Sequence, residues 1–186
     1  MRLAGAPAAL ALLLLSVDHG AAAPVKEGQT APLAALAGVI DADGRAADLW
    51  RMVSAPQPRG SSPARRATLL VFWASWCAPC IHEIPVLNEL RRFYGERGLR
   101  VVGLGIREGG ETLASLKEAA AKNGATYPVF YDSEGRAQEA FEVHTLPMSA
   151  LIDAEGTVRW IGPALPADVA ARVEAALAPG EPRGAK

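Results

Sequence analysis

The chain has 186 residues, half of them apolar, and its 19 basic and 20 acidic residues leave a formal net charge of −1. This size and composition are typical of one soluble globular domain. The near-neutral balance argues against a sequence-independent grip on nucleic acid, which depends on a basic face that neutralises phosphates.

The N-terminal stretch has the pattern of a secretory signal. Met1 and Arg2 supply a positive start, Leu3 to Val17 is apolar, and a run of small residues follows. We expect cleavage near the end of that run, after Ala22 in preference to Ala23, with an uncleaved membrane anchor as the alternative. Export would place the mature chain in a periplasmic or other extracytoplasmic compartment, where disulfides persist.

The remainder predicts a single domain without internal repeats. Three prolines and several small polar residues after Val53 predict a surface loop, and the C-terminal residues are polar. The predicted organisation is a signal peptide or anchor at 1–22, a domain at 23–178 with a Pro/Ser-rich loop at 54–66, and a flexible tail at 179–186.

Hydrophobic patterning predicts strands that alternate with helices. A strand at 36–40 and the turn residues Asp43-Gly44 predict a hairpin that ends near Asp48. The later elements are a helical turn at 49–53, a strand at 67–74, a helix from 79 to a stop at Gly95 with a kink at Pro85, a strand at 100–106, a helix at 111–122, a short strand at 127–131, a turn at 132–135, a helix at 136–141, a strand hairpin at 148–153 and 157–162, and a helix at 167–177. This order predicts an α/β fold, with a mixed central sheet, helices on both faces and an N-terminal hairpin.

Both cysteines of the chain lie where the apolar strand gives way to a helix. Cys77 and Cys80 are one helical turn apart, so the two sulfurs can form a disulfide. Unpaired N–H groups and the helix macrodipole at the helix start favour a thiolate, which lowers the pKa of Cys77 below the free value of about 8.5. We therefore predict that Cys77 is the attacking nucleophile and that Cys80, deeper and more buried, resolves the mixed disulfide.

Other uses of the cysteine pair fit less well. A structural zinc site usually needs four protein ligands, and the chain adds only His19, His82 and His144 to the pair. Attachment of c-type haem needs histidine directly after the second cysteine, where Ile81 stands. Copper binding by the two soft sulfurs remains an alternative. We predict no metal and no cofactor, and assign no role to His82 or His144.

The residues around the pair resemble a known family. Residues 72–80, FWASWCAPC, resemble the active site of thioredoxin-fold proteins, and residues 80–85, CIHEIP, resemble the TlpA/ResA-type extracytoplasmic thiol-disulfide oxidoreductases. Residues 145–147, TLP, resemble the cis-proline segment of that family. The resemblance covers roughly residues 28–177 and implies a thioredoxin-like fold, in which we expect Trp73 to pack in the core.

The resemblance also implies an acid that serves the resolving cysteine. Glu83 lies one helical turn after Cys80, where a partly buried carboxylate can accept the thiol proton. Its alternative role is that of an ordinary first-turn glutamate that interacts with the helix dipole. Typical thioredoxins carry a buried aspartate six residues before the first cysteine. This chain has Val71 there, which makes Glu83 the candidate replacement.

A wall for substrate binding is a further implication of the resemblance. It sets Pro147 opposite the dithiol, with a cis bond after Leu146 that turns backbone groups toward a bound peptide. A trans proline that opens a strand is the alternative. We expect Trp76 to shield Cys77 and, together with Pro79, to form part of the docking surface.

These features predict an exported thiol-disulfide oxidoreductase. TlpA/ResA-type proteins often reduce cysteines needed for cytochrome c maturation or for a copper site, so the resemblance implies partners such as apocytochrome c or copper-site proteins, and a membrane electron donor. Ala78 and Pro79 carry no charge that would stabilise a reduced oxidant, which favours a reductase. The alternatives are a disulfide-forming oxidase and a copper-binding or partner-docking module that uses the dithiol without turnover.

Overall fold

The computed structural model describes residues 25–54 and 67–178. The predicted signal peptide at 1–22, the predicted tail at 179–186 and all but the first residue of the predicted loop at 54–66 lie outside the described residues. Among the helices that the structure describes, none is both long and apolar enough to cross a membrane.

A mixed sheet forms the centre of the fold. Its strands are β1 (Val39–Ile40), β2 (Ala46–Ala47), β3 (Ala67–Trp73), β4 (Leu99–Gly105), β5 (Val129–Tyr131), β6 (Met148–Asp153) and β7 (Val158–Pro163). They lie in the order β2-β1-β5-β4-β3-β6-β7. β3 runs parallel to β4 and antiparallel to β6, and β4 runs parallel to β5. The β1–β2 hairpin joins the sheet where β1 pairs with β5.

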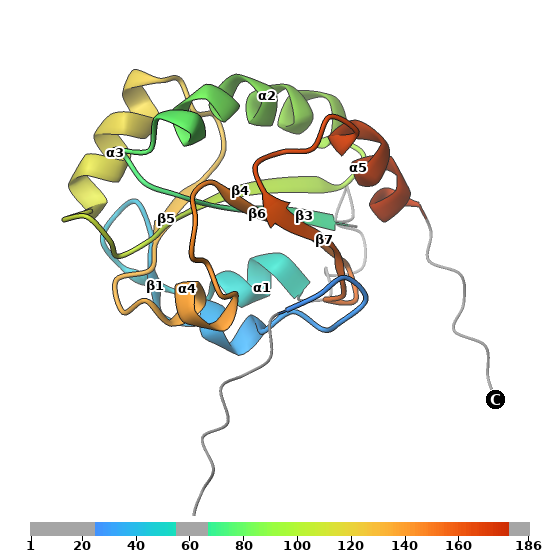
Figure 1. The fold of residues 1–186 in the computed structure, drawn as a ribbon, viewed down its shortest axis with the longest axis horizontal. Coiled ribbons are helices and arrows are strands. Elements are labelled where there is room, and N and C mark those ends of the chain that lie inside the picture. The colour runs from blue at the N-terminus through green and yellow to red at the C-terminus, as the bar shows by residue number, and fades with distance from the viewer. Residues whose placement is uncertain (1–24, 55–66, 179–186) are drawn as a thin grey trace, which may run out of the picture.

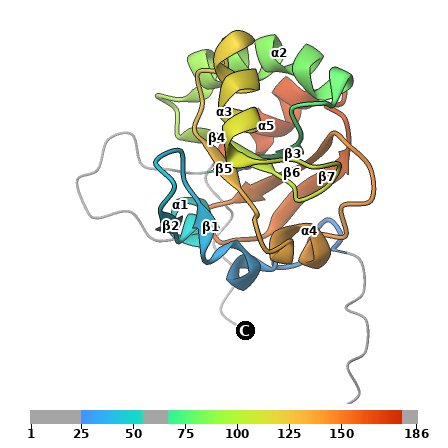
Figure 2. The ribbon, with the colours of Figure 1, turned by 90° about the vertical axis from the view of Figure 1, so that its left-hand side faces the viewer.

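Helices cover both faces of this sheet. They are the 3-10 helix η1 (Leu33–Leu36) and the α-helices α1 (Leu49–Ser54), α2 (Ala78–Tyr94), α3 (Leu113–Lys122), α4 (Arg136–Ala140) and α5 (Val169–Leu177). Figure 1 shows α2, α3 and α5 on one side and α1 and α4 on the other. Figure 2 shows the same two layers from the side. The predicted mixed sheet with helices on both faces is therefore confirmed.

Alternate residues of β3 serve the two faces of the sheet. Leu69 and Val71 belong to the core beneath α2 and α5, whereas Leu70 and Phe72 belong to the core on the side of α1 and α4. All four side chains are buried. The ring of Phe72 packs against Phe141, with ring centroids 5.2 Å apart. Burial on both faces explains why this strand is a continuous apolar run.

The N-terminal elements differ from their predicted bounds. The strand predicted at 36–40 is limited to the two residues of β1, because η1 precedes it and Gly38, with a φ of 74°, turns the chain between them. The predicted hairpin is confirmed by the pairing of β1 with β2 around the turn at Gly44. The helical turn predicted at 49–53 is α1.

Three later elements begin two residues after their predicted first residue. The helix predicted from 111 starts at Leu113, because the Thr112 side chain caps it and accepts the Ser115 N–H at 3.1 Å. β5 starts after Pro128, which has no N–H for a ladder. The helix predicted from 167 starts at Val169, with Asp168 at the N-cap position and without a cap hydrogen bond from its side chain. α2 includes Pro85, and the kink predicted there stays a prediction.

Candidate active site

The cysteine pair lies at the start of α2, directly after β3. Cys77 is the N-cap residue of α2 and forms a disulfide with Cys80, with the two Cα atoms 5.3 Å apart. The Cys77 sulfur also accepts the backbone N–H of Cys80 at 3.2 Å. A helix N-terminus whose N–H groups face a sulfur stabilises negative charge on it. The predicted placement of Cys77 at the helix start is thus confirmed.

The predicted difference in burial between the two cysteines is not present in this oxidised state. Cys77 is 4% exposed and Cys80 is 3% exposed. The two differ instead in position, because Cys77 lines a surface pocket and Cys80 is not among the residues that line it. The disulfide holds both sulfurs against the core beneath α2, which explains their similar burial.

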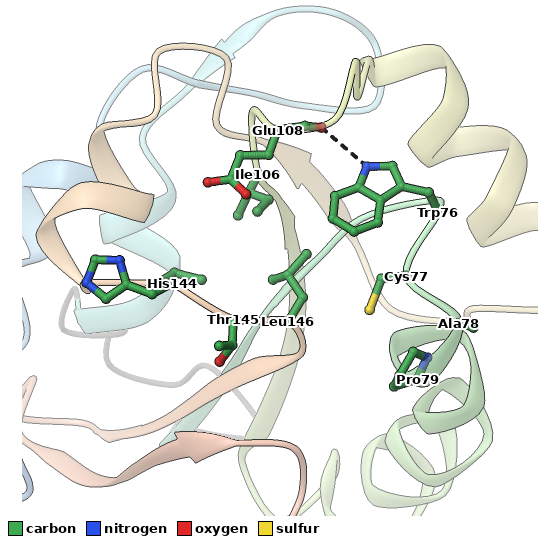
Figure 3. Close-up of a pocket in the computed structure, with 10 residues that line it drawn as sticks. Trp76, Cys77, Ala78, Pro79, Ile106, Glu108, His144, Thr145 and Leu146 are labelled. Carbon is green, nitrogen blue, oxygen red and sulfur yellow. Dashed lines mark hydrogen bonds between the residues drawn. The ribbon is translucent and has the colours of Figure 1, made fainter.

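The pocket has a volume of about 270 Å³. Figure 3 shows Trp76, Cys77 and Pro79 on one side of it and His144, Thr145 and Leu146 on the other. Its full lining is Trp76, Cys77, Ala78, Pro79, Ile106, Glu108, Val143, His144, Thr145 and Leu146. Segments from α2, from the end of β4 and from the loop before β6 therefore meet at the disulfide.

The segment before β6 forms the wall opposite α2. The bond between Leu146 and Pro147 is cis, as predicted. Leu146 lines the pocket, whereas Pro147 is buried and is not among the lining residues. The carbonyl oxygen of Pro147 accepts the backbone N–H of Ala164 at 3.1 Å. This bond ties the wall to the loop after β7.

The two tryptophans near the disulfide have different surroundings. Trp73 is buried in the core beneath α2, as predicted. Trp76 is 53% exposed and lines the pocket beside Cys77. Its indole N–H donates to the carbonyl oxygen of Glu108 at 3.3 Å. Gly109 contacts the same ring, because a Cβ added there would lie 2.8 Å from the indole nitrogen.

Glu83 lies half-buried on α2, three residues after Cys80. One carboxylate oxygen accepts the backbone N–H of Leu165 at 2.7 Å, and the other is buried without a hydrogen-bond partner. Burial raises the pKa of Glu83, and the bond from Leu165 opposes part of that rise. Burial and the charge of Glu83 together raise the pKa of Tyr127. The carboxyl group thus has one oxygen that is free to take a proton.

Position 71 offers no acid to the dithiol. Val71 is buried beneath α2 and pairs with Gly103 on β4 and Ser149 on β6. The departure from the usual thioredoxin aspartate is therefore also present in the structure, and Glu83 is the half-buried acid on the helix that carries both cysteines.

One residue that supports the site was not identified from the sequence. Glu111 is 6% exposed, and its carboxylate accepts the backbone N–H and hydroxyl of Ser75, the N–H of Thr112 and the hydroxyl of Ser115. It thereby joins the loop before Cys77 to the start of α3. The available signal was its place directly before a Thr-x-x-Ser capping pattern.

The histidines have different positions. His144, which the sequence left without a role, lines the pocket, and its imidazole lies at the end far from Cys77 (Figure 3). His82 is exposed on α2. Across the described residues, no three histidine, cysteine, aspartate or glutamate side chains gather in a way that could hold a metal ion.

Comparison with known proteins places this geometry in context. The Redoxin family model matches residues 57–171. The thiol-disulfide oxidoreductase ResA of Geobacillus kaustophilus is 33% identical over 96 residues, which are 52% of this chain and 53% of the relative. ResA of Bacillus subtilis is 28% identical over 93 residues, half of each chain. The chain therefore spans about half the length of these relatives.

Solved structures share the fold. A putative thiol:disulfide interchange protein DsbE from Chlorobium tepidum matches with a TM-score of 0.65 and 25% identity, over 82% of this chain and 99% of that one. A secreted disulfide oxidoreductase from Mycobacterium tuberculosis, 18% identical, matches with a TM-score of 0.59 over 76% of this chain and 96% of that one.

Proposed function

Because the chain belongs to the Redoxin family of thioredoxin-fold proteins, we propose that it is an extracytoplasmic thiol-disulfide oxidoreductase that reduces disulfides in partner proteins. The observation that carries this proposal is the Cys77–Cys80 disulfide at the N-terminus of α2, with Cys77 facing an open pocket. A disulfide that is formed within the protein and reached from its surface is suited to exchange with another protein.

The reaction begins with the reduced protein and an oxidised partner. The Cys77 thiolate attacks one sulfur of the partner disulfide, a mixed disulfide forms, and the other partner sulfur leaves as a thiolate. Cys80 then loses its proton and attacks the Cys77 sulfur. The mixed disulfide breaks, the partner leaves with two reduced cysteines, and the bond between Cys77 and Cys80 re-forms. Two electrons pass from this chain to the partner.

Glu83 supplies the proton acceptor for the second step in this proposal. Its unpartnered oxygen is buried, and Glu83 follows Cys80 by one helical turn on α2. Burial raises the pKa of Glu83 toward the range in which a carboxylate exchanges protons with a thiol. With Val71 in place of the usual acid, proton removal from Cys80 falls to this side chain.

The partner segment binds in the pocket, between the two walls described above. Trp76 and Pro79 form one wall and Leu146 the other, with the buried Pro147 next to Leu146 in the chain. An open pocket of about 270 Å³ accommodates a cysteine and the residues next to it rather than a large cofactor. This fits a protein substrate presented as an exposed segment.

We also assign partners and a location to this chain. Similar proteins are named thiol-disulfide oxidoreductase ResA and thiol:disulfide interchange protein DsbE, and the substrates that we assign to this chain are disulfides in apocytochrome c or in copper-site proteins. A membrane protein returns the electrons. The signal at 1–22 directs residues 23–178 outside the cytoplasm, and no cofactor takes part.

A trapping experiment tests the proposal. In the Cys80→Ser variant the second step is blocked, so we expect Cys77 to stay covalently joined to its partner, as a reducible adduct in non-reducing gels of the compartment that holds the protein. The Cys77→Ser variant is the matched control and should form no adduct. Partner binding without an adduct in Cys80→Ser would contradict the enzymatic proposal and favour a docking module.

A further inference from the structure

The loop between β7 and α5 makes two hydrogen bonds with the candidate active site. The N–H of Ala164 donates to the carbonyl oxygen of Pro147 at 3.1 Å, and the N–H of Leu165 donates to Glu83 Oε1 at 2.7 Å. Pro147 adjoins the pocket wall formed by Leu146, and Glu83 lies on α2. Two consecutive backbone donors thus join the two sides of the site. Figure 1 shows the loop passing beside α2.

Ala164 has an unusual backbone conformation that serves this arrangement. Its φ of 60° lies in the left-handed region, which disfavours residues with a Cβ. In an extended strand, successive N–H groups point to opposite sides, so two neighbours cannot both turn inward without a change of conformation. The left-handed turn at Ala164 allows both donors to reach the site. Such a conformation persists where surrounding contacts impose it, often at functional sites.

We propose that the Ala164–Leu165 backbone is a clamp that positions the Glu83 carboxylate for proton transfer from Cys80 and couples it to the Pro147 wall. The clamp rests on the proposed function, because it deepens the role of Glu83 in the resolving step. Leu165 engages Oε1 and fixes the carboxyl group, which leaves the buried Oε2 as the free acceptor. The two backbone groups are positioning groups, since neither touches the reacting sulfurs.

The backbone N–H of Leu165 holds the Glu83 carboxylate in place. In the described part of the chain, Glu83 makes no ion pair. The group that donates a hydrogen bond to its carboxylate is the backbone N–H of Leu165, which carries no charge. Tyr127 is a titratable group close enough for the charge of Glu83 to raise its pKa. Cys80 lies one helical turn before Glu83 on α2 and becomes titratable once the disulfide is reduced. His82 is exposed on the same helix. Burial raises the pKa of this carboxyl group, and the Leu165 N–H is the hydrogen-bond donor that opposes part of that rise.

An amide-to-ester replacement at position 165 tests the clamp. Incorporation of the α-hydroxy analogue of leucine keeps the side chain and removes only the N–H. We expect the Glu83 carboxyl titration, followed by 13C NMR, to move to higher pH, because the ionised form loses its donor. In the pH profile of the rate of insulin disulfide reduction, the acid limb should also move to higher pH. The rate on that limb should be roughly tenfold lower than in the wild type, because hydrogen bonds to charged groups are stronger than those between neutral groups.

The matched control is the same replacement at Val169, whose N–H donates to the Pro166 carbonyl oxygen at 3.0 Å. It removes a backbone hydrogen bond from the same region without touching Glu83. The Glu83 titration and the pH dependence of insulin reduction should therefore both stay unchanged. An unchanged Glu83 titration in the position 165 variant would overturn the clamp. A shifted titration with an unchanged rate profile would also overturn it, as the carboxyl group would then play no part in turnover.

A pair of genetic variants provides a second route. Ala164→Val places a β-branched residue at a φ of 60° and should displace both donors, which shifts the pH profile as the ester does. Gly44→Val imposes similar strain at a φ of 81°, in an open turn far along the chain, and should leave the profile unchanged. Equal effects of the two variants would overturn the clamp. If the wild-type protein itself fails to reduce insulin, the proposed function fails instead.

Discussion

At the scale of single residues, the half-buried Glu83 links the chemistry of the site to the stability of the fold. Its pKa lies above the ordinary value of 4.5, chiefly because burial disfavours the charged form. The folded protein therefore holds this proton more firmly than the unfolded chain does. The contribution of Glu83 to stability is complete below about pH 4.5 and is lost as the pH rises through the folded pKa.

Glu83→Gln removes that titration, and it should make the free energy of unfolding of the oxidised protein fall less between pH 4.5 and pH 8 than in the wild type. Urea unfolding at several pH values measures the effect. Glu89→Gln, at an exposed position on the same helix, is the control and should keep the wild-type pH dependence. An unchanged slope in Glu83→Gln would show that the folded pKa of Glu83 is not raised.

The ring of Trp76 packs closely against Gly109. A Cβ at position 109 would lie 2.8 Å from the indole nitrogen, so Gly109→Ala should displace the ring from the pocket and change its fluorescence. The KM for an oxidised protein substrate should rise by several-fold, because the ring forms part of the proposed docking wall. Gly110→Ala is a matched control, since Gly110 also has a positive φ but open space around its Cβ.

At the scale of elements, Glu111 connects the loop before Cys77 with α3. Its carboxylate accepts hydrogen bonds from Ser75, Thr112 and Ser115, and Glu111→Ala removes the acceptor of the half-buried Ser75 N–H and hydroxyl. Thr112 and Ser115 keep their hydrogen bonds to each other. We expect a loss of about 2 kcal/mol in the free energy of unfolding, because a hydrogen bond to a charged group contributes ~1.5–3 kcal/mol.

Chemical denaturation measures this loss. Glu118→Ala, at an exposed position on α3, should change stability by less than about 0.5 kcal/mol, as is usual for surface positions. Equal stabilities of the two variants would mean that the buried carboxylate contributes nothing to the connection. Reduced activity of Glu111→Ala under conditions where it is fully folded would add a positioning role for the Ser75 loop.

At the scale of the whole molecule, local and long-range features differed in how well the sequence revealed them. The strand, the dithiol and the helix after it follow from a continuous apolar run and a local spacing, and they were predicted correctly. The opposite wall of the pocket depends on strand register, which pairs Phe72 with Met148 and Trp73 with Gly105. This register brings the loop before β6 and the end of β4 to the disulfide.

The hydrogen bond from Leu165 to Glu83 also could not be predicted from the sequence, because it joins distant parts of the chain. Leu165 is 82 residues away along the chain and contributes a backbone N–H, so its side chain carries no mark of the contact. Glu111 was assigned to a helix turn because its partners, Ser75 among them, lie across the fold. Family resemblance, rather than periodicity, supplied the cis bond before Pro147.

The direction of electron flow is a property of the whole molecule. A reductase needs a folded state that favours the disulfide, so the oxidised protein should be more stable to unfolding than the reduced protein. Closing the short loop from Cys77 to Cys80 restricts the unfolded chain, which corresponds to about 2 kcal/mol on the chain-entropy relation. We expect urea unfolding to give a difference of this order in favour of the oxidised form.

Equilibration with glutathione provides the independent measurement of that direction. The protein should come to rest mainly oxidised in mixtures where a strong disulfide oxidant would be reduced. The double variant Cys77→Ser/Cys80→Ser should show one unfolding curve under oxidising and reducing conditions, which controls for effects outside the pair. A reduced protein that is the more stable form, together with a strongly oxidising couple, would contradict the reductase direction and favour a disulfide-forming oxidase built on the same site.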